Sequence, residues 1–171
     1  KLLEALKTVK GIETHLVLTN TARMNVSIET VFKPAYVESL ADFVHKNSNI
    51  GASIASGSFK VDGMIVAACA MKTLSSIVHS HADGLLVRAA DVTLKENRKL
   101  VLMPRETPLH LGHCKLMYEA ALMGAIIAPP MPAFYGKPKT IDDLVNHSVG
   151  RVLDLFDIET DIINRWQGTN Y

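Results

Sequence analysis

The sequence is poor in the features that mark unusual protein classes. It contains only 2 cysteines and 6% aromatic residues in a chain of 171. Two cysteines exclude a disulfide framework of the kind that stabilises small secreted proteins. Eighteen basic against 17 acidic residues give a net charge of +1, without the broad positive surface that a nucleic-acid binder uses. We therefore expect no nucleic-acid partner.

Long apolar runs and targeting signals are also missing. No apolar run approaches the roughly 20 residues that span a bilayer, and the chain does not start like a secretory signal. With 48% hydrophobic and 20% charged residues, the composition is typical of a globular protein. We predict a cytoplasmic protein without membrane contact, with a single domain over residues 1–171.

Several catalytic signatures are absent as well. The chain has neither the G-x-G-x-x-G fingerprint of dinucleotide binding nor the G-x-S-x-G turn of a serine hydrolase. Two histidine groups, at His79 and His81 and at His110, His113 and Cys114, suggest a metal at first sight. Neither repeats as a matched pair of ligands, and no carboxylate cluster completes a site. We expect no bound metal.

Strands and helices alternate along the sequence. A continuous apolar run, Gly63–Cys69, has the length and composition of a buried parallel strand. The pattern predicts strands at 14–18, 63–69, 99–103 and 125–128, helices at 1–9, 20–29, 71–80, 82–96, 109–123 and 140–156, a helix start followed by a loop at 34–44, and a short strand or turn at 53–58. This order predicts an α/β fold: a doubly wound parallel sheet with helices on both faces.

Polar or rigid segments follow four of the predicted strands. They cover residues 19–21, 69–73, 104–108 and 129–135. In doubly wound sheets, ligands bind at the carboxyl ends of the strands. The four segments therefore predict one composite site.

The segment that joins Cys69 to the helix beginning near Met71 presents backbone N–H groups at a helix start. Such a start can hold a phosphate or the edge of a flavin, although an ordinary strand-to-helix turn has the same pattern. In the loop after the next strand, two prolines frame Arg105 and Glu106. Arg105 can bind a phosphate or planar anion through two parallel hydrogen bonds, and Glu106 can carry a proton. A surface Arg–Glu pair is the alternative.

Arg88 and Lys95 lie seven residues apart and share one face of a predicted helix. Asp91 and Glu96 are available as partners, so the pattern alone slightly favours a salt-bridged helix over a functional role. The segment 129–135 combines three prolines with Met131, two aromatic residues and an alanine. It is stiff and apolar, and is suited to form the wall of a pocket.

Five strings in order carry a resemblance to a known family. They are CAMKTL, RAADVTLKE, LVLMPRETPL, PPMPAFY and TIDDLVNHSVGRVLD. Together they resemble the UbiX-like flavin prenyltransferases, which include the small subunits named for phenylacrylic and hydroxyarylic acid decarboxylases. The resemblance runs from Lys1 to about Gly168.

The resemblance implies a three-layer, flavodoxin-like Rossmann fold that assembles into a homododecamer. It implies binding of FMN and dimethylallyl phosphate, without a metal. The dimethylallyl group would be joined to N5 and C6 of the flavin, and the prenylated FMN would be passed to a UbiD-type decarboxylase. A non-catalytic flavin-binding subunit of a hydroxyarylic acid decarboxylase and a direct phenolic acid decarboxylase are the alternatives.

The resemblance also implies roles for individual residues. Glu106 would handle the proton lost on ring closure, and Glu29 would reach the site from a neighbouring subunit. Trp166, in a tail of about residues 157–171, would close over the allyl group. The implied flavin contacts are Thr19, Ala70, Met71, Lys72, Thr73, Arg88 and Arg105, and the implied prenyl phosphate contacts are Tyr135, Arg151 and Lys95.

Two departures from the family pattern stand out. The family usually has serine where this chain has Ala70, so a hydroxyl near the flavin is lost. The family also begins with a strand and a Gly-rich phosphate loop, whereas this sequence starts at Lys1 inside a predicted helix. We therefore expect that a first strand precedes Lys1 in the natural protein.

Overall fold

The computed structural model describes residues 1–163, 165, 166 and 168. The chain divides into two compact units. The sheet unit is Glu13–Pro129, and the tail unit combines Lys1–Ile12 with Pro130–Tyr171. The single domain expected over residues 1–171 stays a prediction. No helix among the described residues combines the length and apolar character needed to cross a membrane.

The sheet unit contains parallel strands in two groups. β1 (His15–Leu18) pairs with β2 (Phe43–Lys46). β3 (Gly63–Cys69), β4 (Lys99–Pro104) and β5 (Ile126–Ile127) form the second group in that order. The strand β2 lies where the sequence indicated a loop, so that prediction was wrong. The side chains of β2 are mostly exposed and show no strand pattern in the sequence. The strand forms because its backbone pairs with β1.

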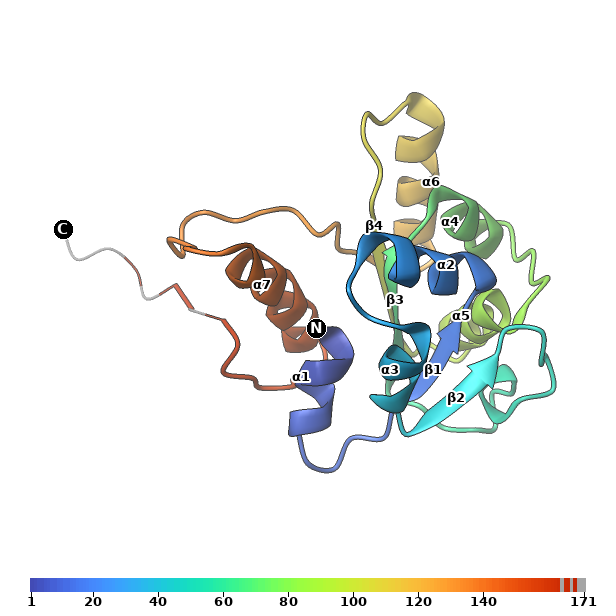
Figure 1. Cartoon of the computed structure of the whole chain (residues 1–171). Helices are drawn as coiled ribbons and strands as arrows, with labels where there is room; N and C mark the ends of the chain where they lie inside the picture. Colours follow the sequence, from blue (N-terminus) through green and yellow to red (C-terminus); the bar gives the residue numbers. More distant parts are fainter. Residues whose placement is uncertain (164, 167, 169–171) are drawn as a thin grey trace. The chain divides into compact units, whose positions relative to one another are not determined.

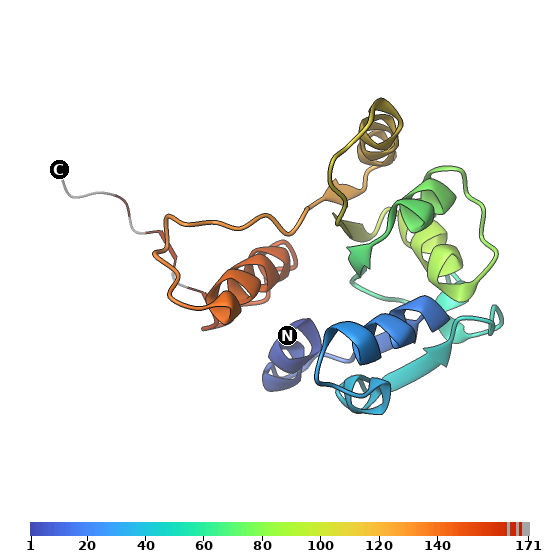
Figure 2. The ribbon, with the colours of Figure 1, turned by 45° about the horizontal axis from the view of Figure 1, so that its top comes forward.

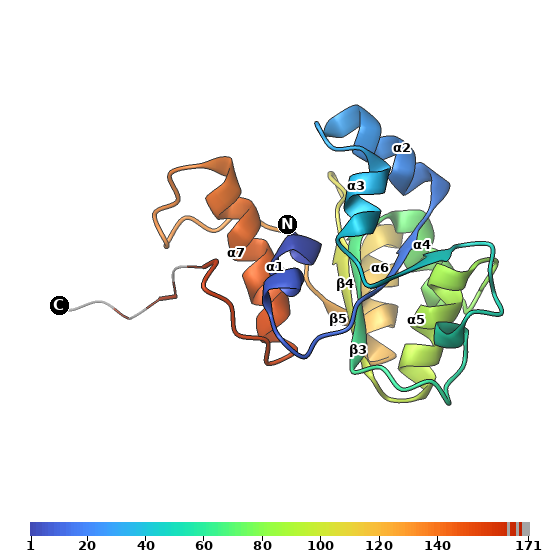
Figure 3. The same ribbon diagram turned by 60° about the horizontal axis from the view of Figure 1, so that its bottom comes forward.

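The core of the sheet unit follows from the apolar runs of β3 and β4. Leu100 and Leu102 are fully buried, and Val66 of β3 lies opposite Leu102 in the ladder. The helices α4 (Met71–Val78), α5 (Leu85–Lys95) and α6 (Leu111–Leu122) contribute Leu74, Ile77, Val87, Ala90 and Ala120 to the same cluster. Figure 3 shows these three helices grouped along one side of β3, β4 and β5.

Two short helices and a turn complete the sheet unit. α2 (Asn20–Glu29) and α3 (Pro34–Ser39) contact each other and lie beside the β1–β2 pair in Figure 2. The segment predicted as a strand or turn is a short 3₁₀ helix, η1 (Ser53–Ala55), packed on α5. Parallel strands with helices on both sides confirm the predicted α/β architecture.

The start of α5 differs from the prediction for a local reason. The helix begins at Leu85, three residues later than expected, because Asn47 satisfies its first N–H groups. The carbonyl oxygen of Asn47 accepts from Leu85 N at 2.7 Å, and its side-chain oxygen accepts from Leu86 N at 2.9 Å. Because Asn47 directly follows β2, α5 starts at the carboxyl edge of the strands.

The tail unit is built on two helices, α1 (Leu2–Thr8) and α7 (Ile141–Asp154). Thr140 and Asp143 form a reciprocal capping box that fixes the start of α7. Lys1 Nζ lies 3.0 Å from a carboxylate oxygen of Asp142, which ties the start of α1 to that of α7. α7 buries Val149, Gly150, Val152 and Leu153, and both helices are visible in Figure 1.

Candidate functional site

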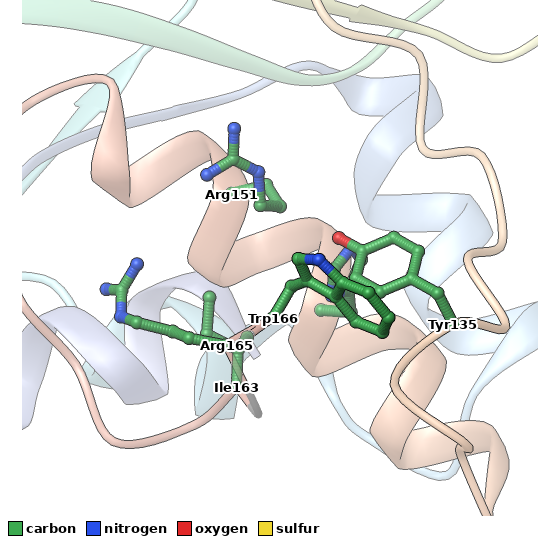
Figure 4. A pocket seen from close by; sticks show the side chains of 6 residues that line it. Tyr135, Arg151, Ile163, Arg165 and Trp166 are labelled. Atoms are coloured by element: carbon green, nitrogen blue, oxygen red, sulfur yellow. The ribbon is translucent and has the colours of Figure 1, made fainter. Parts of the chain in front are cut away.

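The tail unit contains a cavity of about 390 Å³ beside α7. Its wall combines cationic, hydrogen-bonding and aromatic side chains, as Figure 4 shows. They are Tyr135, His147, Arg151, Ile163, Arg165 and Trp166. Three of these are residues that the resemblance placed at the prenyl donor: Tyr135 and Arg151 at its phosphate, and Trp166 over its allyl group. The structure brings these three together.

Tyr135 is held by two rings. Its Oη lies 3.1 Å from Nε2 of His147, and the two rings meet edge to face. On its other side, Trp166 also meets Tyr135 edge to face, with ring centroids 6.1 Å apart, within the range of a favourable aromatic pair. The phenol is therefore oriented by α7, while the tail supplies an aromatic surface next to it.

A carboxylate at the end of α7 holds the two arginines of the cavity. Asp154 Oδ2 accepts from Arg151 Nη1 at 2.7 Å. Arg165 binds the same carboxylate with both terminal nitrogens, at 2.7 and 3.1 Å. Hydrogen bonds from Arg165, together with the charges of both guanidinium groups, lower the pKa of Asp154. The carboxylate is therefore ionised at neutral pH, and its one negative charge faces the two positive charges of Arg151 and Arg165.

In the sheet unit, α4 begins directly after β3 with Ala70 as its N-cap residue. Ala70 makes no side-chain capping hydrogen bond, so no capping oxygen covers the N–H groups of Met71, Lys72 and Thr73. Ala70 is exposed, while Cys69 before it is fully buried. The turn can thus present backbone N–H donors and the positive end of the helix dipole to an anion or a flavin edge.

The Arg105 loop lies at the same edge as this turn. Cys69 pairs with Pro104 in the β3–β4 ladder, so Ala70 and Arg105 each follow one of two paired residues. Arg105 and Glu106 are both exposed. Glu106 Oε1 accepts from Thr107 N at 3.0 Å, which fixes the carboxylate against its own loop. Among the described residues, neither side chain forms an ion pair, so the alternative of a surface Arg–Glu pair is not what this loop contains.

Thr19 and Glu29 lie at opposite ends of α2. Thr19 is its N-cap, and its Oγ1 accepts from Ala22 N at 3.1 Å. The cap uses a lone pair of the hydroxyl, which leaves the O–H proton for another acceptor. Glu29 is the last residue of the helix and is exposed. Ten helical residues span about 15 Å, so these two side chains do not meet at one point within a chain.

Arg88 and Lys95 lie on the same helix, α5, but Arg88 is nearer the carboxyl ends of the strands and Lys95 lies near their amino ends. Arg88 donates to the carbonyl of Ala55 at 3.2 Å and to Asp91 at 2.9 Å. Lys95 pairs with Glu96 at the end of α5, just before β4 begins. Both cations therefore have the structural partners that the sequence offered. Arg105 follows the other end of β4, and six strand residues span roughly 20 Å, so Lys95 and Arg105 cannot hold the same phosphate within one chain.

The two histidine groups that suggested a metal have other contacts in the structure: Nδ1 of His79 lies 2.7 Å from the carbonyl oxygen of Ser75, and His110 contacts His113. The rings of His110 and His113 lie in a tilted contact with centroids 3.6 Å apart, and His110 caps the start of α6 by accepting from Gly112 N. Within the described part of the chain, no group of three or more His, Cys, Asp or Glu side chains is arranged to hold a metal ion.

Sequence reasoning missed three lining residues of the cavity, His147, Ile163 and Arg165, and the carboxylate of Asp154 that binds its arginines. Helical spacing could have found two of them, because His147 and Asp154 lie four residues before and three after Arg151 on one face of α7. Arg165 had a weaker signal, its position next to the only tryptophan of the chain.

The chain matches known proteins along nearly its whole length. A family model described as "Flavoprotein" matches residues 1–153. The chain is 55% identical over 170 residues to the flavin prenyltransferase UbiX of Escherichia coli strain K12, covering 98% of this chain and 90% of that protein. It is 52% identical to flavin prenyltransferase UbiX of Thauera aromatica, covering 98% and 86%.

Two solved structures have nearly the same backbone. A dodecameric FMN-dependent UbiX-like decarboxylase from Escherichia coli O157:H7 matches with a TM-score of 0.96 and 51% identity, covering 98% of this chain and 90% of that one. AnUbiX (PadA1), solved in complex with FMN and dimethylallyl pyrophosphate, matches with a TM-score of 0.96 and 48% identity, covering 99% and 89%. These matches confirm the flavodoxin-like fold and the resemblance noted in the sequence.

Proposed function

The chain belongs to the UbiX-like family of flavin prenyltransferases and is an enzyme of that kind, and we propose that the tail-unit cavity binds its prenyl donor. The observation that carries this proposal is the combination of Arg151, Tyr135 and Trp166 around one cavity of about 390 Å³. A guanidinium and a phenol suit a phosphate, and aromatic rings suit a short allyl chain. Dimethylallyl phosphate has both parts.

The polar side of the cavity would promote departure of the phosphate. Ionising the carbon–oxygen bond of an allylic phosphate builds negative charge on the leaving oxygens. Arg151 and the Tyr135 hydroxyl can stabilise that charge with donors that are already in place. His147, hydrogen-bonded to Tyr135, keeps the phenol oriented. Of the proline-rich segment 129–135 only Tyr135 lines the cavity, so Trp166 and Tyr135 would keep water away from the allyl cation, whose charge is also favoured by an aromatic face.

FMN would bind at the carboxyl edge of the strands in the sheet unit. The residues there fit an isoalloxazine and its phosphate: the N–H groups of Met71, Lys72 and Thr73 have no capping oxygen, and the Thr19 hydroxyl keeps its proton. Arg105 follows the adjacent strand and can donate to a carbonyl of the flavin or to a phosphate. Arg88, neutralised by Asp91, would act as a more distant positive neighbour. The reduced flavin itself supplies the nucleophilic N5 and C6.

A base is needed when the flavin ring regains its aromaticity. Glu106 is held at the carboxyl edge by its own loop and has no ion-pair partner among the described residues, so its carboxylate can accept that proton. Glu29 lies at the far end of α2 and Lys95 at the far edge of the sheet. For Glu29 and Lys95 to act at the same site as Glu106, they must come from another copy of the chain. We propose an assembly in which neighbouring subunits supply these two side chains. The dodecamer of the E. coli O157:H7 relative supports such an arrangement.

We further propose that the prenylated FMN passes to a UbiD-type decarboxylase, and that the reaction takes place in the cytoplasm. Incubation of the protein with reduced FMN and dimethylallyl phosphate tests the central step. The expected product, seen by mass spectrometry, is a flavin heavier by one prenyl unit. The same assay with dimethylallyl pyrophosphate shows whether one phosphate suffices.

The outcomes of this assay separate the alternatives. FMN binding without any adduct, for either donor, would favour a non-catalytic flavin-binding subunit. Loss of carbon dioxide from a phenolic acid with this protein alone would favour a direct decarboxylase. An Arg151→Met variant that forms the adduct with an unchanged KM for the donor would remove the tail-unit cavity from the reaction.

A further inference from the structure

One face of α7 carries both the cavity residues and the contacts that hold the tail. His147, Gly150, Arg151 and Asp154 recur at spacings of three and four residues, which places them on the same side of the helix. His147 and Arg151 face the cavity. Gly150 and Asp154 instead contact two residues of the segment that follows α7, Ile163 and Arg165.

Gly150 lets the tail approach the helix closely. It is buried, and a Cβ atom in its place would lie 2.5 Å from Cγ2 of Ile163 and 3.1 Å from its Cδ1. Real Cβ atoms do not tolerate such a distance, so any larger residue would displace Ile163. Glycine is also a weak helix former, about 1 kcal/mol worse than alanine in a helix interior. Helix formation therefore does not explain a glycine at position 150, whereas the close approach of Ile163 does.

Asp154 provides the second point of attachment. It binds Arg165 with both carboxylate oxygens and Arg151 with one, and its side chain is only 17% exposed. Isolated surface ion pairs contribute little, but a bidentate arginine–carboxylate pair with a largely buried carboxylate is the favourable exception. The lowered pKa of Asp154 keeps this carboxylate charged at neutral pH.

The attached residues are the immediate neighbours of Trp166. The Arg165 guanidinium points away from the Tyr135–Trp166 pair in Figure 4, toward its carboxylate. Arg165 is therefore engaged in holding the tail. With Ile163 and Arg165 both fixed on α7, the backbone of the next residue is fixed as well, and the indole is left facing Tyr135.

We propose that Asp154 and Gly150 are positioning residues that fasten the tail to α7, so that Trp166 covers the donor cavity. Asp154 has a second effect, because it holds one nitrogen of Arg151 and leaves the rest of that guanidinium for a phosphate. This inference rests on the proposed function for its kinetic consequences. The placement of Trp166 can be measured without any reaction.

The test compares Asp154→Asn with Asp157→Asn. Asparagine keeps the shape of Asp154 but loses its charge and one acceptor. Asp157 is exposed, lies three residues away and has a positive φ of 58°, a conformation that asparagine accepts readily. It therefore controls for the loss of one carboxylate near the end of α7. Gly150→Ala tests the other attachment, and Arg165→Met serves if Asp154→Asn folds poorly.

Trp166 is the only tryptophan of the chain, so its fluorescence reports the tail alone. Asp154→Asn, Gly150→Ala and Arg165→Met are expected to shift its emission to the red and to make acrylamide quench it more strongly, whereas Asp157→Asn matches the wild type. Trypsin should cut after Arg165 several-fold faster in Asp154→Asn and Gly150→Ala, because a bound arginine is a poor trypsin site.

In Asp154→Asn we expect the KM for dimethylallyl phosphate to rise roughly tenfold, because a change of that size corresponds to the loss of one charged hydrogen bond. The affinity for FMN should not change. The double variant with Arg165→Met should be no worse than the more affected single one, because the two act through each other. Unchanged fluorescence and trypsin cleavage in these variants would overturn the inference even in an active enzyme. An inactive wild type whose variants still change fluorescence would leave the fastening intact and refute the proposed function.

Discussion

Replacing Ala70 by serine should stabilise the flavin-free protein, because α4 begins without a side-chain cap. Ala70 has the extended backbone of an N-cap residue (φ −67°, ψ 152°) and makes no capping hydrogen bond. Its side chain is exposed, so a hydroxyl can be added there without displacing a neighbour. A serine Oγ in this conformation can accept from the N–H of Lys72 or Thr73.

The size of the effect follows from that one hydrogen bond. Exchanging alanine for serine at an N-cap is worth about 1 kcal/mol. For a chain of this length, about 1 kcal/mol corresponds to a rise of roughly 2–4 °C in Tm. The N–H groups of the same turn are those proposed to hold the flavin. Binding of FMN should therefore reduce the difference in Tm between the serine and alanine proteins, since ligand and hydroxyl satisfy the same donors.

The assay is thermal unfolding of the wild type, Ala70→Ser and Ala70→Cys, each with and without FMN. Cysteine has nearly the size of serine but a poor acceptor, so it separates the hydrogen bond from the added volume. If the serine and cysteine variants unfold at the same temperature, the turn does not present the donors described above. Faster adduct formation by Ala70→Ser than by Ala70→Cys would in addition place the reacting flavin edge at this turn.

Three further predictions concern the base, the thiols and the core. Glu106→Gln should slow adduct formation at least tenfold while leaving FMN affinity nearly unchanged, and equal single-turnover rates would remove Glu106 from the proton transfer. Burial raises the pKa of Cys69 to about 12, whereas Cys114 is exposed; a thiol reagent at pH 8 should therefore label one cysteine of the native protein quickly, and Cys114→Ser should abolish that labelling. Leu102→Ala, at a fully buried position, should cost about 2–5 kcal/mol of unfolding free energy in a denaturant titration, and a cost below 1 kcal/mol would contradict the packing of β4.

The sequence was sufficient for the elements whose own residues carry the pattern. β3 and β4 are apolar runs of strand length, and the start of α7 is marked in the sequence by its capping residues Thr140 and Asp143. β2 has no such pattern: its four residues are mostly exposed, and it exists because β1 pairs with it. The His15 ring of β1 also stacks on Phe43, and its Nδ1 lies 2.9 Å from Nε2 of His45. Burial and the neighbouring His15 lower the pKa of His45. Contacts of this kind join residues 30 positions apart, which no local pattern contains.

The site shows a different limit of sequence reasoning. Motifs identified Arg88, Lys95 and Arg105 as cations of one site, but a motif does not state at which end of an element a residue lies. α5 begins at the carboxyl edge of the strands and ends at the opposite edge, so the seven residues from Arg88 to Lys95 lead away from Arg105. About 20 Å of β4 then separates Lys95 from that arginine. If both act on one reaction, as the family resemblance implies, the reaction must join different copies of the chain. The site is then a property of the assembly, and its composition cannot be read from the order of residues in a single subunit.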